Sequence, residues 1–272
     1  MAEAYGGNIS LTNSIHNPKV AILITDGTNC DEELFYAFQK YGGDPKYVHV
    51  NELRDKSQNL KNYQILAIPG GFAYGDDVAS GKILAVELIS FLKDQLKDYI
   101  NKEGLVLGVC NGFQVLVRTG LLPFGNLGKM DATLAQNESG HFECRFVKIK
   151  IEKSQAKFLD PYVGKTLDIA VNHGEGRFFA RAQNLAKIEG QKLVFCRYVD
   201  ENGQKTQKYP DNPNGSLKAI AGICDPTGKI LGLMPHPEKI VDITQHPNWR
   251  RGNVEAKGSF IFEGMIKFAK QR

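Results

Sequence analysis

The fold is decided by the stretch LVLGVCNGFQVLV, residues 105–117. Its first residues, Leu105 to Leu107, form strands readily, and the apolar spacing from Gly112 to Val117 is typical of a helix. Cys110 therefore lies at a sharp turn from a strand into a helix, where a side chain projects over the helix N-terminus. Because a helix N-terminus favours negative charge, this position favours the thiolate. The pattern predicts a cysteine nucleophile.

A second segment, PHPE at residues 235–238, contains a candidate base. Two prolines favour an extended backbone, in which residues i and i+2 face the same side. Glu238 can then hold one ring nitrogen of His236 while the other nitrogen faces the thiol of Cys110. These three residues predict a nucleophile, a base and an orienting carboxylate. Taken alone, each segment also has a structural explanation, since free cysteines are often buried in cores and PHPE could form a surface turn.

The third element is the apolar run ILAIPGGF at residues 65–72, which ends in a pair of glycines. Glycines have no Cβ, so their backbone N–H groups can approach a ligand closely. The N–H groups of Gly71 and Asn111 are therefore expected to form an oxyanion hole beside Cys110. An ordinary turn after a strand is the alternative for Gly70 and Gly71.

PGGF, GVCNGFQ and a late PHPE, in this order, resemble the class I (triad) glutamine amidotransferases. A narrower resemblance, to the glutaminase subunits of phosphoribosylformylglycinamidine synthase, begins near Lys19 and extends to the end of the chain. Four further segments carry it, namely DGTNCD (26–31), GFAYGD (71–76), NESGHFECR (137–145) and HGEGRF (173–178). Residues 76–81, Asn172 and the long 183–213 segment depart from the family pattern.

The resemblance implies a flavodoxin-like fold and an enzyme that hydrolyses L-glutamine to glutamate and ammonia through a Cys110 thioester. His236 and Glu238 would act with Cys110. Substrate would be positioned by Gly70, Gln114 and the segment Asn172, His173 and Gly174.

No metal or organic cofactor is expected in this chain; ATP and magnesium would be bound by the partner. That partner would be a PurL-type synthetase subunit, in some complexes joined by a small PurS-type subunit, which uses the ammonia in de novo purine biosynthesis. Two alternatives stay open, a class I glutaminase that feeds a different ammonia acceptor and a catalytically weak subunit that binds a partner.

Composition agrees with a globular enzyme of 272 residues. Lys and Arg number 34 against 30 Asp and Glu, a net charge of +4 spread without a long basic block. This argues against nucleic acid as the main partner. No apolar run approaches the roughly 18 residues of a membrane span, and no secretion signal is present, so a cytoplasmic location is expected.

The remaining motifs predict neither a zinc site nor a phosphate loop. The sequence has no CxxC pair and no HExxH motif, and Ile83 stands where a phosphate loop needs Ser or Thr. Cys30, Cys144, Cys196 and Cys224 are expected to be packing residues.

Alternation of strands and helices in the first half predicts a mostly parallel sheet covered by helices on both faces. The expected strands are 20–24, 47–50, 65–68 and 105–107, with Asn29 capping the first helix and a single long helix ending near Tyr99. The second half predicts a smaller antiparallel sheet, with strands at 146–151 and within 192–199, a hairpin turn at Asn202-Gly203 and a closing helix at 260–268. Residues 1–18 are expected to be a poorly ordered leader, and residues 19–272 one glutaminase domain.

Overall fold

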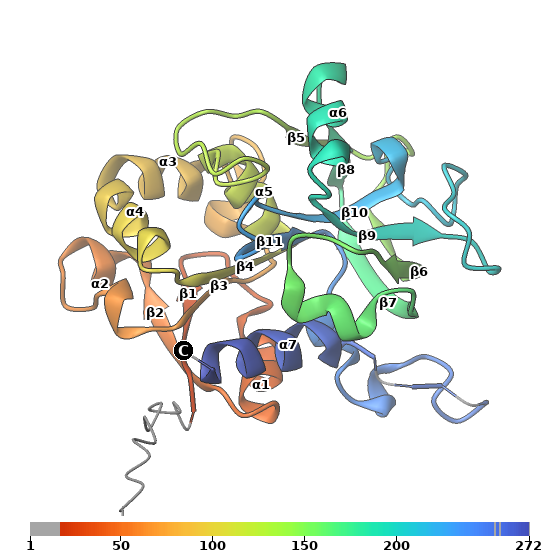
Figure 1. Ribbon diagram of the computed structural model, residues 1–272, viewed down its shortest axis with the longest axis horizontal. Helices are drawn as coiled ribbons and strands as arrows, with labels where there is room; N and C mark the ends of the chain where they lie inside the picture. The colour runs from red at the N-terminus through yellow and green to blue at the C-terminus, as the bar shows by residue number, and fades with distance from the viewer. Residues whose placement is uncertain (1–16, 253, 256, 272) are drawn as a thin grey trace, which may run out of the picture.

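The computed structural model describes residues 17–252, 254–255 and 257–271, so most of the predicted leader lies outside the described residues. A nine-stranded sheet forms its centre, in the strand order β2-β1-β3-β4-β11-β10-β9-β6-β7 (Figure 1). Its strands are β1 (Lys19–Ile24), β2 (Asp44–His49), β3 (Ile65–Ile68), β4 (Leu105–Val109), β6 (Glu143–Ile151), β7 (Thr166–His173), β9 (Val194–Val199), β10 (Ile220–Cys224) and β11 (Ile230–Leu233). A separate pair consists of β5 (Thr133–Gln136) and β8 (Glu175–Phe179).

The sheet changes character along its width. From β2 to β11 all neighbouring strands run parallel, and from β11 to β7 all run antiparallel. The central parallel strands β3 and β4 are buried at every residue, as expected where helices cover both faces of a sheet. The predicted α/β fold is confirmed. The antiparallel strands mostly continue the large sheet, and β5 and β8 form the small separate one.

Helices cover both faces of the parallel half (Figure 1). The helices are α1 (Asp31–Lys40), α2 (Val50–Arg54), α3 (Lys82–Phe91), α4 (Lys93–Asn101), α5 (Asn111–Thr119), α6 (Ala182–Gly190) and α7 (Ser259–Lys270). α1 and α7 pack together on one face, where the rings of Phe38 and Phe262 meet edge to face at 5.1 Å. α3, α4 and α5 lie on the other face.

Two local expectations were wrong. The single helix expected to end near Tyr99 is two helices, because the backbone leaves helical geometry at Leu92. The residue before α1 is Cys30 and makes no side-chain cap, so Asn29 is not the cap; the acidic first turn of α1 suits the helix dipole instead. The hairpin turn expected at Asn202-Gly203 forms, and an antiparallel bridge between Val199 and Lys205 closes it.

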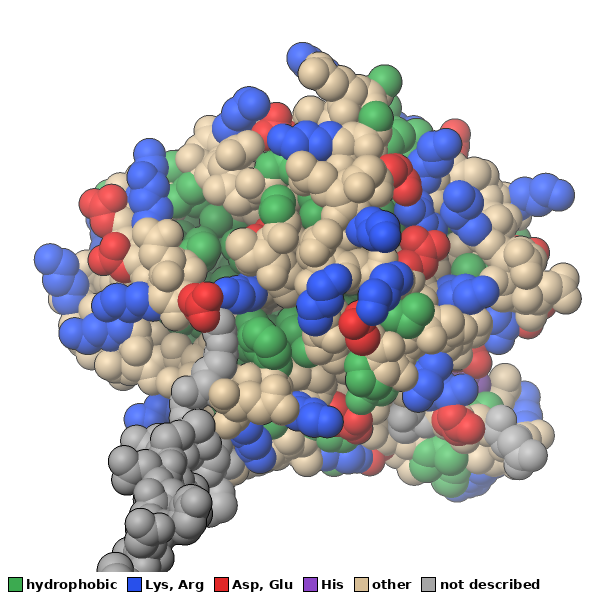
Figure 2. Space-filling view, in the orientation of Figure 1, with side chains coloured by type: hydrophobic (Ala, Val, Ile, Leu, Met, Phe, Trp, Pro, Cys, Tyr) green, Lys and Arg blue, Asp and Glu red, His purple; other side chains and the backbone are tan. Residues whose placement is uncertain are grey.

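Basic and acidic side chains are interspersed over the face seen in Figure 2, in keeping with the small net charge. Within the described part of the chain, no helix has the length and apolar character needed to cross a bilayer.

Candidate active site

The predicted chemical groups converge where three neighbouring parallel strands end. Gly70 and Gly71 follow β3, Cys110 follows β4, and His236 follows β11, and β4 pairs with both of the other strands. The carboxyl ends of parallel strands are the usual place for ligand sites in α/β sheets.

Cys110 occupies a strained backbone turn, with φ 50° and ψ −104°, directly before α5. Its N–H donates to Leu233 O at 2.8 Å, which fixes the turn against β11. The turn also needs glycine at position 112, because a Cβ there would lie 2.0 Å from Ile68 O. Strain of this kind is costly and concentrates at functional sites. The strand-to-helix elbow predicted for Cys110 is confirmed.

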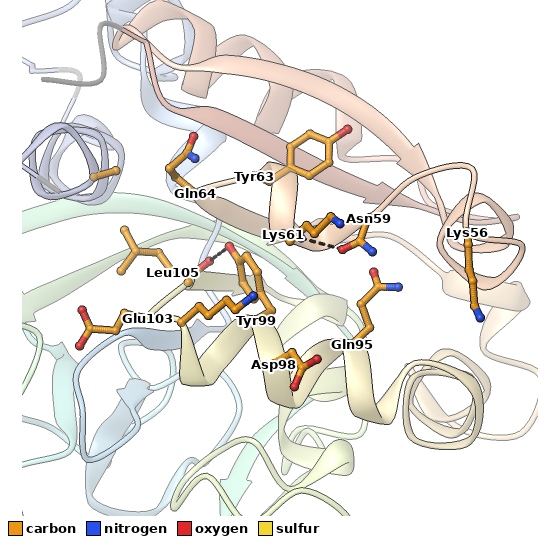
Figure 3. A pocket seen from close by; sticks show the side chains of 13 residues that line it. Lys56, Asn59, Lys61, Tyr63, Gln64, Gln95, Asp98, Tyr99, Glu103 and Leu105 are labelled. Atoms are coloured by element: carbon orange, nitrogen blue, oxygen red, sulfur yellow. Dashed lines mark hydrogen bonds between the residues drawn. The ribbon is translucent and has the colours of Figure 1, made fainter. Parts of the chain in front are cut away.

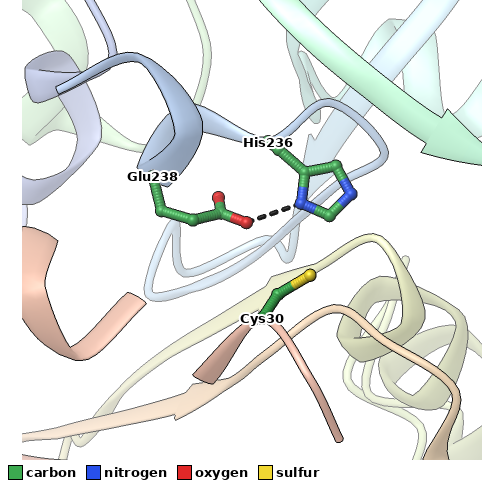
Figure 4. Close-up of side chains that lie close together, drawn as sticks. All are labelled: Cys30, His236 and Glu238. Carbon is green, nitrogen blue, oxygen red and sulfur yellow. Dashed lines mark hydrogen bonds and ion pairs between the residues drawn. The ribbon is translucent and has the colours of Figure 1, made fainter. Parts of the chain in front are cut away.

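His236 and Glu238 form a fully buried pair, with His236 Nδ1 2.5 Å from Glu238 Oε1 (Figure 4). The two prolines were expected to give an extended backbone here, and that expectation was wrong. Pro237 instead begins a 3₁₀ helix, Pro237–Ile240, which brings the carboxylate back towards the ring. The backbone N–H of His236 donates to the backbone oxygen of Ala170 at 2.8 Å, which ties this segment to β7.

The surroundings of His236 favour its charged form. Burial acts to lower the pKa of the imidazole, but the Glu238 carboxylate and the thiols of Cys110 and Cys30 outweigh it and raise this pKa well above its usual range. His236 Nε2 is buried and makes no hydrogen bond to any described residue. The ring therefore favours its imidazolium form and has Nε2 free to exchange a proton.

Cys30 also belongs to this cluster, which the sequence analysis missed. It is buried directly before α1, and its Sγ points towards the His236–Glu238 pair (Figure 4). The acidic run Asp31 to Glu33 marks a helix start and was the available signal for a cysteine at a helix N-terminus. Cys144 is exposed, so the expectation of a packing residue was wrong there, whereas Cys196 and Cys224 are core residues as expected.

A cavity of about 360 Å³ opens beside Cys110. It is lined by five residues predicted for catalysis or substrate binding and by Gly71 of the expected oxyanion hole. These are Gly71, Cys110, Gln114, Asn172, His173 and Gly174. Its remaining lining comes from Phe72, Asp76 and Ser80, from the 136–142 segment and from Glu175. Gly70, Asn111, His236 and Glu238 are not among its lining residues.

Several predicted substrate contacts use their side chains to build the cavity wall. Gln114 Nε2 donates to Glu175 O at 2.5 Å, and its Oε1 accepts from Asn111 Nδ2 at 3.1 Å. Asp76, in the atypical 76–81 segment, also accepts from Asn111 Nδ2, at 3.0 Å. This network fixes the start of α5 against β8.

The His173 ring is held on both sides, with Nδ1 3.1 Å from Asn137 Oδ1 and Nε2 3.4 Å from Asn214 Nδ2. Burial and the neighbouring His236 lower the pKa of His173 to about 3, so the ring is neutral. Asn172 turns its side chain to Cys144 and Lys239, and its carbonyl oxygen accepts from Cys110 Sγ at 3.4 Å. His173 and Asn172 therefore face the cavity largely through their backbone.

The two N–H groups expected to form an oxyanion hole are free to do so. Antiparallel pairing with residues 27–30 uses Phe72 N and Gly70 O, and the Gly71 N–H donates to no described residue. The Asn111 N–H, at the first position of α5, likewise donates to none.

A larger cavity, about 900 Å³, lies at the opposite end of the strands, where residues before β3 and β4 meet α4 (Figure 3). Lys56, Lys61, Tyr63, Gln95 and Tyr99 are among its lining residues. It contains no cysteine or histidine, so it lacks a nucleophile and a base for the predicted chemistry.

Comparisons with known proteins agree with this geometry. The CobB/CobQ-like glutamine amidotransferase domain matches residues 17–269. The phosphoribosylformylglycinamidine synthase subunit PurQ of Dehalococcoides mccartyi is 40% identical over 255 residues, covering 93% of this chain and 98% of that protein. A subunit of the same name from Methanococcus maripaludis is 40% identical, covering 86% and 87% of the two chains.

Among solved structures, a chain of PurLQS from Thermotoga maritima superposes with a TM-score of 0.72 at 27% identity, covering 93% of this chain and 99% of that chain. The sequence resemblance, the fold and the cysteine elbow thus agree, and this chain belongs to the glutamine amidotransferases and, within them, to the PurQ family.

Proposed function

We propose that this chain hydrolyses L-glutamine at Cys110 and passes the ammonia to a synthetase subunit, as the glutaminase subunit of phosphoribosylformylglycinamidine synthase. The observation that carries the proposal is the strained Cys110 turn at the mouth of a cavity, backed by a buried His236–Glu238 pair. The names of the curated relatives support the same assignment.

In the first half of the reaction, the Cys110 thiolate attacks the side-chain amide carbon of glutamine. The amide oxygen becomes an oxyanion, and the N–H groups of Gly71 and Asn111 are placed to stabilise it. The His236 imidazolium, held by Glu238, gives its proton to the leaving nitrogen, and ammonia departs.

In the second half, neutral His236 takes a proton from water, which attacks the thioester carbon. The carbon–sulfur bond breaks, glutamate leaves, and Cys110 returns as the thiolate beside the imidazolium. The charge preference of His236 suits both halves, because the ring begins and ends each turnover protonated.

Substrate contacts follow from the cavity lining. A cavity of about 360 Å³ suits a small molecule. Gln114, Asn172, His173 and Gly174 line it and remain the proposed positioning residues, whereas Gly70 is not among its lining residues. We assign Asn172 and His173 to backbone contacts, since their side chains are bonded elsewhere.

The proposal also includes a synthetase partner that uses the ammonia. Glutamine hydrolysis by the thiol, the imidazole and backbone N–H groups uses no cofactor, so ATP and magnesium are assigned to a PurL-type synthetase that consumes the ammonia. The solved PurLQS assembly supports that partner, and its composition supports a small PurS-type subunit as well. A cytoplasmic location belongs to the same proposal, because a reactive thiol needs reducing surroundings and the five cysteines are free.

The test separates the two halves of the complex reaction. Cys110→Ala, assembled with the synthetase, should lose glutamine-dependent product and keep product formation from high ammonium salt. Cys224→Ala, a truncation in the core, serves as the matched control and should keep both activities. Equal loss of both activities in Cys110→Ala would contradict the division of labour. Product formed only with another ammonia acceptor would favour the alternative glutaminase.

A further inference from the structure

Cys30 stands next to the catalytic pair but has no part in the glutaminase steps. It lies directly before α1 and is only 6% exposed, and its Sγ faces His236 and Glu238 (Figure 4). One ligand atom from each of Cys30, His236 and Glu238 lies within 4.8 Å of the others.

Two polar atoms of this cluster lack protein partners. His236 Nε2 and Glu238 Oε2 are buried and make no hydrogen bond to any described residue. A buried polar atom left unpaired costs free energy, so such atoms mark places where a ligand adds stability. Both belong to side chains that are at most 1% exposed.

Gly70 lets the same groups approach the backbone closely. A Cβ at position 70 would lie 2.7 Å from His236 Cε1, 3.5 Å from Cys30 Sγ and 3.4 Å from Cys110 Cβ. The absence of a side chain at this position therefore allows the imidazole and the Cys30 thiol to pack beside each other.

The side chains of this cluster determine which kind of ion it can bind. A thiolate, an imidazole and a carboxylate are the side chains that bind Zn²⁺, and hard cations such as Mg²⁺ prefer oxygen alone. Tetrahedral zinc with bonds of about 2.0–2.3 Å holds neighbouring ligand atoms roughly 3.5 Å apart. The three ligand atoms already lie within 4.8 Å of one another, so a bound ion would draw them closer together.

We propose that Cys30, His236 and Glu238 form a binding site for Zn²⁺ or a similar soft divalent cation, and that occupancy of this site inhibits glutamine hydrolysis. Binding displaces the protons from the Cys30 thiol and from the imidazole nitrogen that binds the ion. One thiolate and one carboxylate neutralise the two positive charges. The imidazole is then a ligand, so it cannot carry a proton to ammonia or take one from water, and the nucleophile loses its base.

A direct test uses Co²⁺ as a spectroscopic probe in the Cys110→Ala protein, which lacks the nucleophile and keeps the proposed ligands. Titration should give one equivalent of bound Co²⁺, with tetrahedral visible bands and a sulfur-to-cobalt charge-transfer band. Adding Cys30→Ser should abolish the charge-transfer band, and adding Cys224→Ala, at a buried cysteine outside the cluster, should leave it intact. Circular dichroism and thermal unfolding check that each variant is folded.

The inhibitory effect is tested in the otherwise unchanged protein. Zn²⁺ should inhibit glutaminase activity reversibly, with recovery on adding a chelator, and Cys30→Ser should raise the half-inhibitory Zn²⁺ concentration about tenfold or more. Two results would overturn the proposal. One is a charge-transfer band lost in Cys110→Ala and kept in Cys30→Ser, and the other is equal inhibition with and without Cys30. Either would place the metal on the nucleophile and leave the assignment of the glutaminase reaction untouched.

Discussion

Two cysteines of this protein occupy equivalent positions, each directly before a helix and each close to His236. Cys110 borders the glutamine-sized cavity, and Cys30 is not among the residues that line it. Both thiols lie close to His236, so access to the cavity decides which one reacts with substrate. From the sequence, only Cys110 was expected at such a position, because Asn29 and not Cys30 was expected to precede α1 directly.

Selective labelling tests that distinction. A chloroketone or diazo analogue of glutamine should alkylate Cys110 and leave Cys30 unmodified, because the analogue binds in the cavity. Peptide mapping by mass spectrometry locates the label. Excess glutamine should protect Cys110, and a label found first on Cys30 would place the substrate site beside Cys30 instead.

His173 predicts a pH dependence of stability. Its pKa is about 3 in the folded protein and near 6.5 once unfolded, so the unfolded state binds more protons between these values. Stability from this group is complete above pH 6.5 and is lost as the pH falls towards 3. At pH 5 the loss is about 2 kcal/mol, from 1.5 pH units at 1.36 kcal/mol each.

The measurement is urea unfolding at pH 7.5 and pH 5. His173→Gln cannot titrate, so its decrease in unfolding free energy between the two pH values should be about 2 kcal/mol smaller than in the wild type. His141→Gln, at an exposed histidine, is the control. An unchanged pH dependence in His173→Gln would mean that another group titrates there.

At the scale of secondary structure, the elbow between β4 and α5 depends on close contact with β3. Gly112→Ala would place a methyl group 2.0 Å from Ile68 O, and neither backbone can move without disturbing the sheet. We expect a loss of about 2 kcal/mol or more in unfolding free energy and a marked fall in glutamine turnover, because Cys110 shifts with the helix.

Gly190→Ala is the matched control for that change. Gly190 ends α6, and a Cβ there meets nothing within 4 Å, so the substitution should leave stability unchanged or raise it by up to about 1 kcal/mol. Stability is measured by thermal and urea unfolding. Equal effects of the two substitutions would show that contact with Ile68 does not restrain the elbow.

Local patterns predicted some elements well and others poorly. Strands β3 and β4 and the elbow at Cys110 were predicted. Each depends on a few consecutive residues, namely a continuous apolar run for each strand and the Gly-x-Cys-x-Gly spacing for the elbow. The His236–Glu238 contact was predicted correctly, but the backbone conformation expected to produce it was wrong. Proline is compatible both with an extended chain and with the first position of a 3₁₀ helix, so the sequence alone does not distinguish the two. The break at Leu92 has no Gly or Pro to announce it.

At the scale of the whole molecule, the parallel half of the sheet carries the nucleophile and the base, and the second half closes the cavity. β7 and β8 supply His173 and Glu175, and the 136–142 segment completes the wall. These contacts join residues far apart in the chain, so no local periodicity could have predicted them. The motif resemblance named His173 and Gly174 but not the bonds that hold them.

Asn137 joins these segments. Its Nδ2 donates to His141 O and His173 O, at 2.8 and 2.7 Å, and its Oδ1 accepts from Gly176 N at 3.0 Å. Asn137→Ala leaves these groups unpaired, at about 1–3 kcal/mol for each one that stays buried. We expect a loss of about 2–4 kcal/mol in unfolding free energy and a KM for glutamine that rises more than kcat falls, because the wall loosens and the nucleophile stays in place.

Steady-state kinetics and urea unfolding test both effects. Asn126→Ala is the control, since that exposed amide makes a hydrogen bond to Asp131 at the surface, and it should change neither quantity. A fall confined to kcat in Asn137→Ala would place Asn137 in the chemistry of the thiol instead of the cavity wall.

The contact between Cys110 Sγ and Asn172 O joins the nucleophile to the end of β7. The sulfur lies 3.4 Å from this carbonyl oxygen, and the next two residues, His173 and Gly174, line the cavity. A substitution that shifts this strand end would therefore disturb the nucleophile and the substrate wall together.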